Sequence, residues 1–124
     1  MKELIKECYQ TAKDKGFWDN QRNVGEMLML VTSELGEAME AHRKDKVANI
    51  YKFNIERQTT PFHEESATKA AFELYIKDTL EDEIADAVIR LFDFAGGLNI
   101  DLETHIRLKL DYNKTREKLH GKKY

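Results

Sequence analysis

The stretch that decides the fold runs from Asn23 to Lys44 and reads NVGEMLMLVTSELGEAMEAHRK. Asn23 is a good N-cap residue, and apolar residues then recur at helical spacing, so we expect a helix over this range. On a helical wheel of about 100° per residue, Glu34 is surrounded by apolar residues, namely Met27, Leu30, Ala38 and Ala41. The pattern therefore predicts that Glu34 lies inside the buried stripe, with Glu37 at its margin.

A buried carboxylate is costly unless a cation neutralises it, because burial removes the hydration of the charge. Two interpretations of Glu34 stay open. It binds a metal ion, or it forms a salt bridge with a Lys or Arg of another helix.

Apolar periodicity predicts helices along most of the remaining chain. Segment 45–61 is the least regular, and Gly96-Gly97 is expected to stop a helix because Gly tolerates the left-handed conformation. Besides 23–44, helices are expected over 2–13, terminated by Gly16, and over 64–95, with an interruption near Asp78. A last helix, capped by Asp101, is expected to run to Leu119 and to bury a stripe of Leu102, Ile106 and Leu110. The expected fold is an all-α bundle of four to five helices.

Size and composition exclude several classes. At 124 residues, the chain is expected to form a single domain over 1–124. A net charge of -3 argues against a nucleic-acid-binding protein. The N-terminal stretch has no apolar run suited to a signal peptide or a membrane span. The lone Cys8 is expected to be a packing residue, which fits a protein of the reducing cytoplasm.

A second acidic pair lies in Glu83-Ile-Ala-Asp86 and has the same spacing as Glu34-Leu-Gly-Glu37. Carboxylates three residues apart share one helical face. Spacing alone proves little, because random placement of 23 acids predicts about four such pairs and four are present. Glu83 and Asp86 fall on a narrow polar arc of an otherwise apolar helix, which faces either a site or water.

Two packed helices with such pairs would gather several carboxylates around one small volume. Like charges at that distance repel unless a hard cation lies between them. Mg²⁺ suits such a site because it takes oxygen ligands and keeps positions for water and phosphate oxygens; Mn²⁺ is a possible substitute. The expected metal ligands and catalytic residues are Glu34, Glu37, Glu83 and Asp86.

The last helix adds a polar and basic side. Lys109, Asn113 and Arg116 share it with Tyr112. Asn113 continues the apolar stripe, so its amide is expected to face another element. Lys109 and Arg116 suit phosphate oxygens, although a solvated basic face explains the same pattern.

Other phosphate and metal chemistries lack their motifs. There is no Gly-rich loop followed by Lys-Ser or Lys-Thr, so a P-loop enzyme is excluded. Only Glu117-Lys-Leu-His120 has the Glu-x-x-His spacing of a di-iron bundle, which needs two such pairs. The remaining histidines have no partners at zinc spacing.

Taken together, residues 16–44, the run Glu83-Ile-Ala-Asp86-Ala-Val-Ile-Arg-Leu, and Lys109-Leu-Asp-Tyr-Asn-Lys-Thr-Arg116 with His120-Gly-Lys-Lys-Tyr resemble the MazG-like nucleotide pyrophosphohydrolases. The resemblance covers most of the chain, with the motifs in order, and is strongest to short, single-domain, phage-type members.

The resemblance implies an all-α NTP pyrophosphatase fold that is completed as a homodimer or a dimer of dimers. It implies magnesium-dependent cleavage of a nucleoside triphosphate between the α- and β-phosphates, which yields a monophosphate and pyrophosphate. Glu34, Glu37, Glu83 and Asp86 match the metal ligands of the family. Asn113 and Arg116, with Lys109, match positions near phosphates or sugar. Trp18 resembles an aromatic that stacks on the base, or packs beside the second helix.

The chain departs from the family pattern at two places. Ser33 precedes Glu34 where an acid often stands, and Glu40 points away from Glu34 on the wheel. The segment 45–77 between the two acidic motifs is longer than usual, and it bears on substrate choice more than on reaction type. The rival interpretation is a non-catalytic helical oligomer that binds a nucleotide or a protein partner, with the acids in salt bridges between helices.

Overall fold

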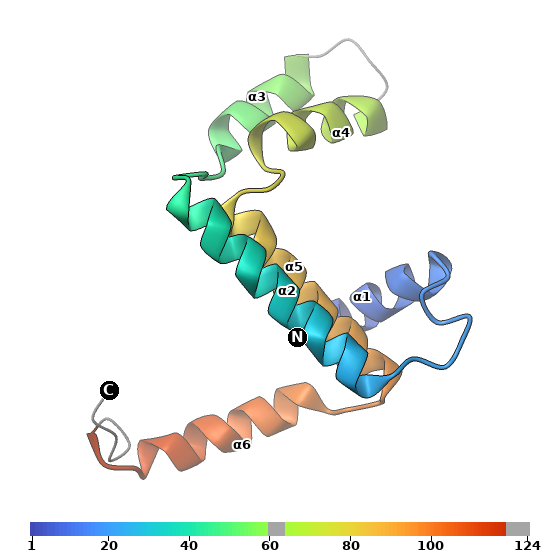
Figure 1. The fold of residues 1–124 in the computed structure, drawn as a ribbon, viewed down its shortest axis with the longest axis vertical. Helices are drawn as coiled ribbons and strands as arrows, with labels where there is room; N and C mark the ends of the chain where they lie inside the picture. Colours follow the sequence, from blue (N-terminus) through green and yellow to red (C-terminus); the bar gives the residue numbers. More distant parts are fainter. Residues whose placement is uncertain (60–63, 119–124) are drawn as a thin grey trace. The chain divides into compact units, whose positions relative to one another are not determined.

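The computed structural model describes residues 1–59 and 64–118, and these residues form an all-α protein without strands (Figure 1). The expected all-α class is confirmed, but the expected number of helices is too small, because the described residues form six. They are α1 (Lys2–Asp14), α2 (Val24–Arg43), α3 (Ile50–Thr59), α4 (Glu64–Tyr75), α5 (Leu80–Gly97) and α6 (Leu102–Lys114).

The helices group into two compact units, and α5 contributes to both. One unit combines residues 1–19 with the chain from Phe92 onward, and the other is Asn20–Leu91. We call them the terminal unit and the central unit.

In the central unit, α2 forms where the sequence predicts a helix. The side chain of Asn23 accepts a hydrogen bond from the Glu26 backbone N–H at 3.0 Å, which confirms the expected cap. One face of α2 is buried and consists of Met27, Val31, Glu34, Ala38 and Ala41. The helix lies alongside α5, as Figure 1 shows, and an ion pair described below joins the two. Small residues on both helices, among them Ala38 and Ala87, allow this close packing.

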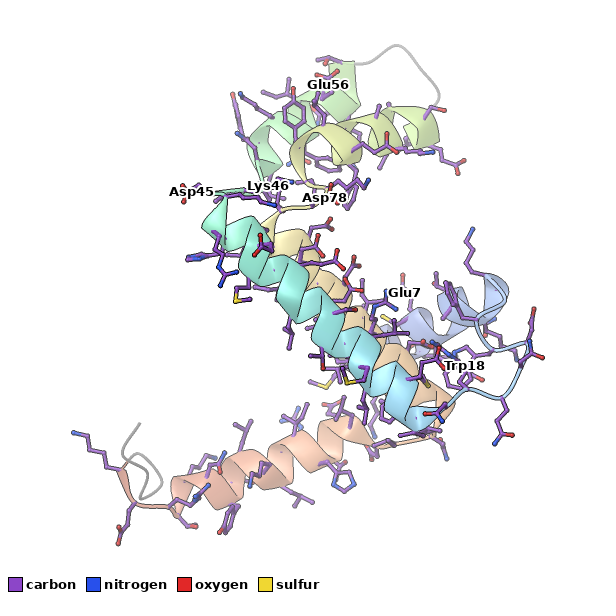
Figure 2. The ribbon with its side chains drawn as sticks, viewed as in Figure 1. Glu7, Trp18, Asp45, Lys46, Glu56 and Asp78 are labelled. Atoms are coloured by element: carbon purple, nitrogen blue, oxygen red, sulfur yellow. The ribbon has the colours of Figure 1, made fainter. Side chains whose placement is uncertain are left out.

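Segment 45–77, whose first part, 45–61, the sequence left least certain, contains the α3–α4 hairpin. The two helices pack against each other through Ala67 and Ala71 of α4, which are fully buried. The backbone breaks where the sequence predicts an interruption, since Asp78 adopts a left-handed φ of 58°. Asp45 does the same at the end of α2, with a φ of 53°, and both lie where the hairpin joins α2 and α5 (Figure 2).

In the terminal unit, Trp18 packs against the end of α5. Its ring meets Tyr9 of α1 edge to face, with centroids 5.4 Å apart. Its indole N–H donates a hydrogen bond of 2.6 Å to a carboxylate oxygen of Asp93. The aromatic pair therefore helps to hold α1 and the connection after it to α5.

Helix α5 ends at Gly97, within two residues of the expected end at Ala95, but neither glycine adopts the expected left-handed conformation. Both residues belong to α5, and the left-handed residue that follows the helix is Asn99, with a φ of 54°. The glycines serve close packing instead. A Cβ on Gly96 would lie 2.6 Å from the Cβ of Tyr9, and one on Gly97 would lie 2.0 Å from the Trp18 ring.

Gly97→Ala is expected to destabilise the protein by about 1–2 kcal/mol, because the added methyl must displace a packed indole ring. The melting temperature of purified protein measures this loss. Gly36→Ala is the matched control, since a Cβ there meets nothing within 4 Å, and it should be neutral or stabilising. Equal melting temperatures for wild type and Gly97→Ala would contradict the packing role.

The last helix departs from its expected length and burial. Asp101 caps α6 as predicted, accepting a hydrogen bond from the Thr104 backbone N–H at 3.3 Å. However, α6 ends at Lys114, and Leu119 lies outside the described residues. The expected stripe of Leu102, Ile106 and Leu110 is not buried, and Leu110 is 55% exposed. Leu102 and Ile106 are half-buried, so the described residues cover this face of the helix only in part.

No helix among residues 1–59 and 64–118 is long and apolar enough to cross a membrane.

Candidate metal centre

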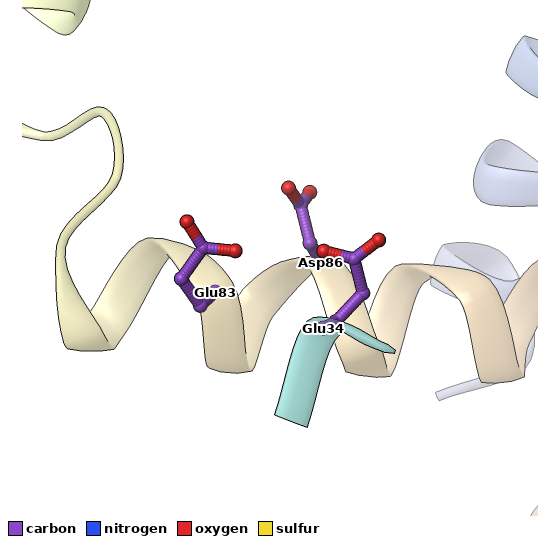
Figure 3. Close-up of side chains that lie close together, drawn as sticks. All are labelled: Glu34, Glu83 and Asp86. Atoms are coloured by element: carbon purple, nitrogen blue, oxygen red, sulfur yellow. The ribbon is translucent and has the colours of Figure 1, made fainter. Parts of the chain in front are cut away.

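Three carboxylates converge in the central unit. Glu34 projects from α2, whereas Glu83 and Asp86 project from α5, and their side chains point toward one another (Figure 3). One oxygen from each residue can be chosen such that all three lie within 4.8 Å of one another. Glu34 and Glu83 are each only 6% exposed, and Asp86 is exposed. We call Glu34, Glu83 and Asp86 the carboxylate trio.

Helical periodicity explains why these residues meet. Glu34 lies among the buried residues of α2, which confirms its predicted place in the apolar stripe. On α5, Glu83 and Ala87 are buried one turn apart, so the face that contacts α2 carries Glu83. On the polar arc of α5, Glu83 is therefore buried, whereas Asp86 is exposed.

Glu34 has a cationic partner on the other helix. The Arg90 Nε–H donates a hydrogen bond of 2.5 Å to a Glu34 carboxylate oxygen. The Arg90 side chain is 38% exposed, so the pair lies at the edge of the buried region. The salt bridge that the sequence left open for Glu34 is therefore formed. Sequence reasoning did not assign it to Arg90, although Arg90 lies one turn after Asp86 on the same polar arc.

Glu83 and Asp86 lack such a partner. No basic side chain among residues 1–59 and 64–118 forms an ion pair with either of them. The pKa of Glu83 is raised, first by burial and then by the nearby charges of Glu37 and Asp82. Burial and the Asp82 and Glu34 carboxylates also raise the pKa of Asp86, against an opposing effect of Arg90. The carboxylates of Glu83 and Asp86 therefore favour the binding of a cation beside them.

The trio borders an open cleft of about 530 Å³, which we call the carboxylate cleft. Its lining is strongly charged, and Glu37 belongs to it, although Glu37 is not one of the three mutually close carboxylates. The lining residues are Glu34, Glu37, Lys69, Phe72, Glu73, Lys77, Asp78, Asp82, Glu83, Asp86 and Arg90. The volume lies within the range of small-molecule sites, about 300–1,000 Å³.

Ser33 and Glu40, the two positions at which the chain departs from the acidic motif of the family it resembles, form hydrogen bonds within α2. The Ser33 hydroxyl donates a hydrogen bond of 2.7 Å to the Leu30 carbonyl of its own helix. Glu40 accepts one of 2.7 Å from Arg43 on the exposed side of α2. Its orientation agrees with the helical wheel.

The donor set of the trio suits magnesium. Oxygens bound to one Mg²⁺ at about 2.1 Å lie roughly 3 Å apart when adjacent and about 4 Å apart when opposite. The spread of up to 4.8 Å in the trio is slightly wider than this. Two of the three oxygens come from Glu83 and Asp86, whose pKa values are raised first by burial and then by neighbouring carboxylates.

The residues predicted to contact substrate lie in the terminal unit. On α6, Lys109 and Arg116 flank the Tyr112 ring, with the charged groups 5.0 Å and 5.9 Å from its centroid. The Asn113 Oδ1 is buried without a hydrogen-bond partner among the described residues. Trp18 is engaged by Tyr9 and Asp93. Contact of Trp18, Lys109, Asn113 and Arg116 with a nucleotide stays a prediction.

Comparisons of the chain with protein-family models, with curated proteins and with solved structures find no match.

Proposed function

We propose that this protein is a magnesium-dependent nucleoside triphosphate pyrophosphohydrolase that cleaves between the α- and β-phosphates and releases a nucleoside monophosphate and pyrophosphate. The observation that carries the proposal is the convergence of Glu34, Glu83 and Asp86 from two helices, with two of the three carboxylates buried. The motif resemblance supplies the reaction, and Glu37, at the border of the same cleft, is the fourth proposed ligand.

The charge of the carboxylate cleft supports a need for cations. Seven carboxylates line it against three basic side chains, which leaves four uncompensated negative charges. Such a surface repels a triphosphate on its own. Two divalent cations would balance this charge, so the cleft becomes complementary to a polyphosphate when metal ions are bound.

In this proposal, the carboxylate of Glu34 is held in place by the protein, whereas those of Glu83 and Asp86 are available to the metal. Arg90 holds Glu34 in one orientation, so that this carboxylate is positioned before any ligand arrives. Glu83 and Asp86 keep their oxygens free of ion pairs in the described chain. When bound by Glu34, Glu37, Glu83 and Asp86, Mg²⁺ supplies charge neutralisation for the phosphates and a water of lowered pKa.

We further propose that the working form is a homodimer or a dimer of dimers. The central unit leaves large apolar side chains exposed on both α2 and α5, including Leu28, Leu35, Met39, Ile84 and Val88. On each helix these residues lie beside the buried face rather than opposite it. A second copy of the chain would cover such a surface.

The direct test incubates the purified protein with dNTPs and NTPs and identifies the products by ion-exchange chromatography. Monophosphate and pyrophosphate in equal amounts are expected with Mg²⁺ or Mn²⁺, and no turnover is expected in EDTA. A screen of canonical and damaged nucleotides then defines base and sugar preference. Release of inorganic phosphate with a diphosphate would contradict cleavage between the α- and β-phosphates.

The Glu34–Arg90 pair favours one rival, a non-catalytic helical oligomer in which the acids serve as salt bridges between helices. That rival predicts no turnover with any nucleotide and no saturable magnesium binding. Calorimetric titration of the metal-free protein with Mg²⁺ separates the two. A saturable isotherm that disappears when Glu83 is changed to Gln supports the metal centre.

A further inference from the structure

The long segment between the acidic motifs supplies one wall of the carboxylate cleft. Lys69 and Phe72 project from α4, and Lys77 follows it, and all three line the cleft together with the trio. The segment that departs from the family pattern is therefore part of the same cavity as the proposed ligands.

Hydrogen bonds join this segment to the ends of α2 and α5. The Leu80 N–H donates to the Lys46 carbonyl at 3.1 Å, and the Ala48 N–H donates to the Glu81 carboxylate at 3.0 Å. At the base of the hairpin, the Asn49 N–H donates to the Tyr75 carbonyl at 2.9 Å. These bonds tie both ends of the hairpin to the helices that carry the trio, so Lys77 is held at the cleft by its own backbone.

Lys69 and Lys77 have few ion-pair partners among the described residues. The Lys77 ammonium forms no ion pair in the part of the chain that the structure describes. Lys69 reaches only Glu73, at 4.0 Å and in solvent. Such an exposed pair contributes little and opens readily. Both ammonium groups are therefore available to an anion beside the carboxylates.

Phe72 adds an apolar surface to a cleft that is otherwise charged. It is 39% exposed, although its neighbours on the same helix, Ala67 and Ala71, are completely covered. An exposed aromatic face next to cationic groups suits a ligand that carries both a planar base and phosphates.

We propose that the α3–α4 segment is the nucleotide-recognition wall of the site, in which Lys69 and Lys77 bind the polyphosphate and Phe72 stacks on the nucleobase. This inference rests on the proposed function and deepens it. It assigns recognition of a base-bearing triphosphate to residues outside the acidic motifs.

Two probes separate the roles. Binding of a non-hydrolysable α,β-methylene dATP and of inorganic tripolyphosphate is measured by calorimetry with saturating Mg²⁺. Lys69→Ala and Lys77→Ala are each expected to weaken both probes about five- to tenfold, because a charge-assisted contact is lost. Phe72→Ala is expected to weaken the dATP analogue about tenfold and to leave tripolyphosphate unchanged.

Matched controls come from α3 of the same hairpin. Lys52 and Tyr51 are exposed, lie outside the carboxylate cleft, and repeat the chemical changes as Lys52→Ala and Tyr51→Ala. Neither should alter the affinity for either probe. Helicity by circular dichroism shows that each variant is folded.

The outcomes distinguish this inference from the proposed function. If the wild type releases pyrophosphate with Mg²⁺ but all three cleft variants bind both probes normally, the recognition wall is overturned and the enzyme stands. Equal weakening by Lys52→Ala also overturns it, because the effect would then reflect net charge. If the wild type shows neither turnover nor magnesium-dependent binding of either probe, the proposed function fails and this inference fails with it.

Discussion

Glu83→Gln is expected to lower magnesium-dependent turnover by about 10³-fold or more while making the metal-free protein more stable. The two effects have one cause. Glu83 is 6% exposed and has no ion pair among the described residues, so its charge is costly unless a cation is bound. Glutamine has nearly the same shape and removes that charge, and with it the metal ligand.

The raised pKa of Glu83 fixes the direction in which the stability of the metal-free protein changes with pH. Because the pKa of Glu83 is raised in the folded protein, the native state binds more protons than the unfolded state between the two pKa values. Stability therefore falls as the pH rises from the unfolded value, about 4.3, through the folded value, and the full cost is present above it. Glu83→Gln should therefore stabilise the metal-free protein at neutral pH, and the stabilisation should vanish in acid.

Thermal melts in EDTA at neutral and acidic pH, together with pyrophosphate release in magnesium, check both halves of the prediction. Glu40→Gln is the matched control. Glu40 lies on the opposite, exposed side of α2, and its pKa is lowered by its hydrogen bond with Arg43. That variant should keep full turnover and should not become more stable. Wild-type turnover by Glu83→Gln would remove Glu83 from the proposed metal centre.

The helical wheel predicted the buried place of Glu34 because the apolar residues around it on α2 mark the face of that helix that packs inward. Asn23 and Asp101 likewise predicted helix starts, since a cap is a local interaction. The partner of Glu34 was not predictable in the same way. Arg90 is 56 residues away, and which cation reaches a buried acid depends on how two helices are aligned along each other.

The glycine pair shows an error of mechanism. Gly96-Gly97 marks the end of α5, but neither residue is left-handed, and Tyr9 and Trp18 occupy the space where their side chains would lie. Helix α3 was not predicted for a third reason. None of its residues is buried and no apolar stripe marks it in the sequence, whereas α4 begins at Glu64, where a helix was expected.

Arg90→Ala is expected to cause the largest loss of stability in the metal-free protein, and magnesium should restore much of it. The change leaves the Glu34 carboxylate buried without its partner and next to two further carboxylates. Breaking a fully buried pair costs about 3–5 kcal/mol. Because Arg90 is 38% exposed, solvent screens part of this, and we expect about 2–3 kcal/mol, or roughly 10 °C in melting temperature.

The magnesium dependence distinguishes a metal centre from a structural salt bridge. A cation bound by the trio neutralises Glu34 in place of Arg90, and a ligand that binds only the folded state raises its stability. The shift in melting temperature on adding Mg²⁺, at matched ionic strength, should therefore be larger for Arg90→Ala than for the wild type. Arg43→Ala, which removes an exposed partner of Glu40, controls for loss of charge and should melt like the wild type with and without magnesium. If Arg90→Ala loses the same stability in Mg²⁺ as in EDTA, the three carboxylates do not share a cation, and the Glu34–Arg90 pair is a salt bridge that stabilises the fold alone.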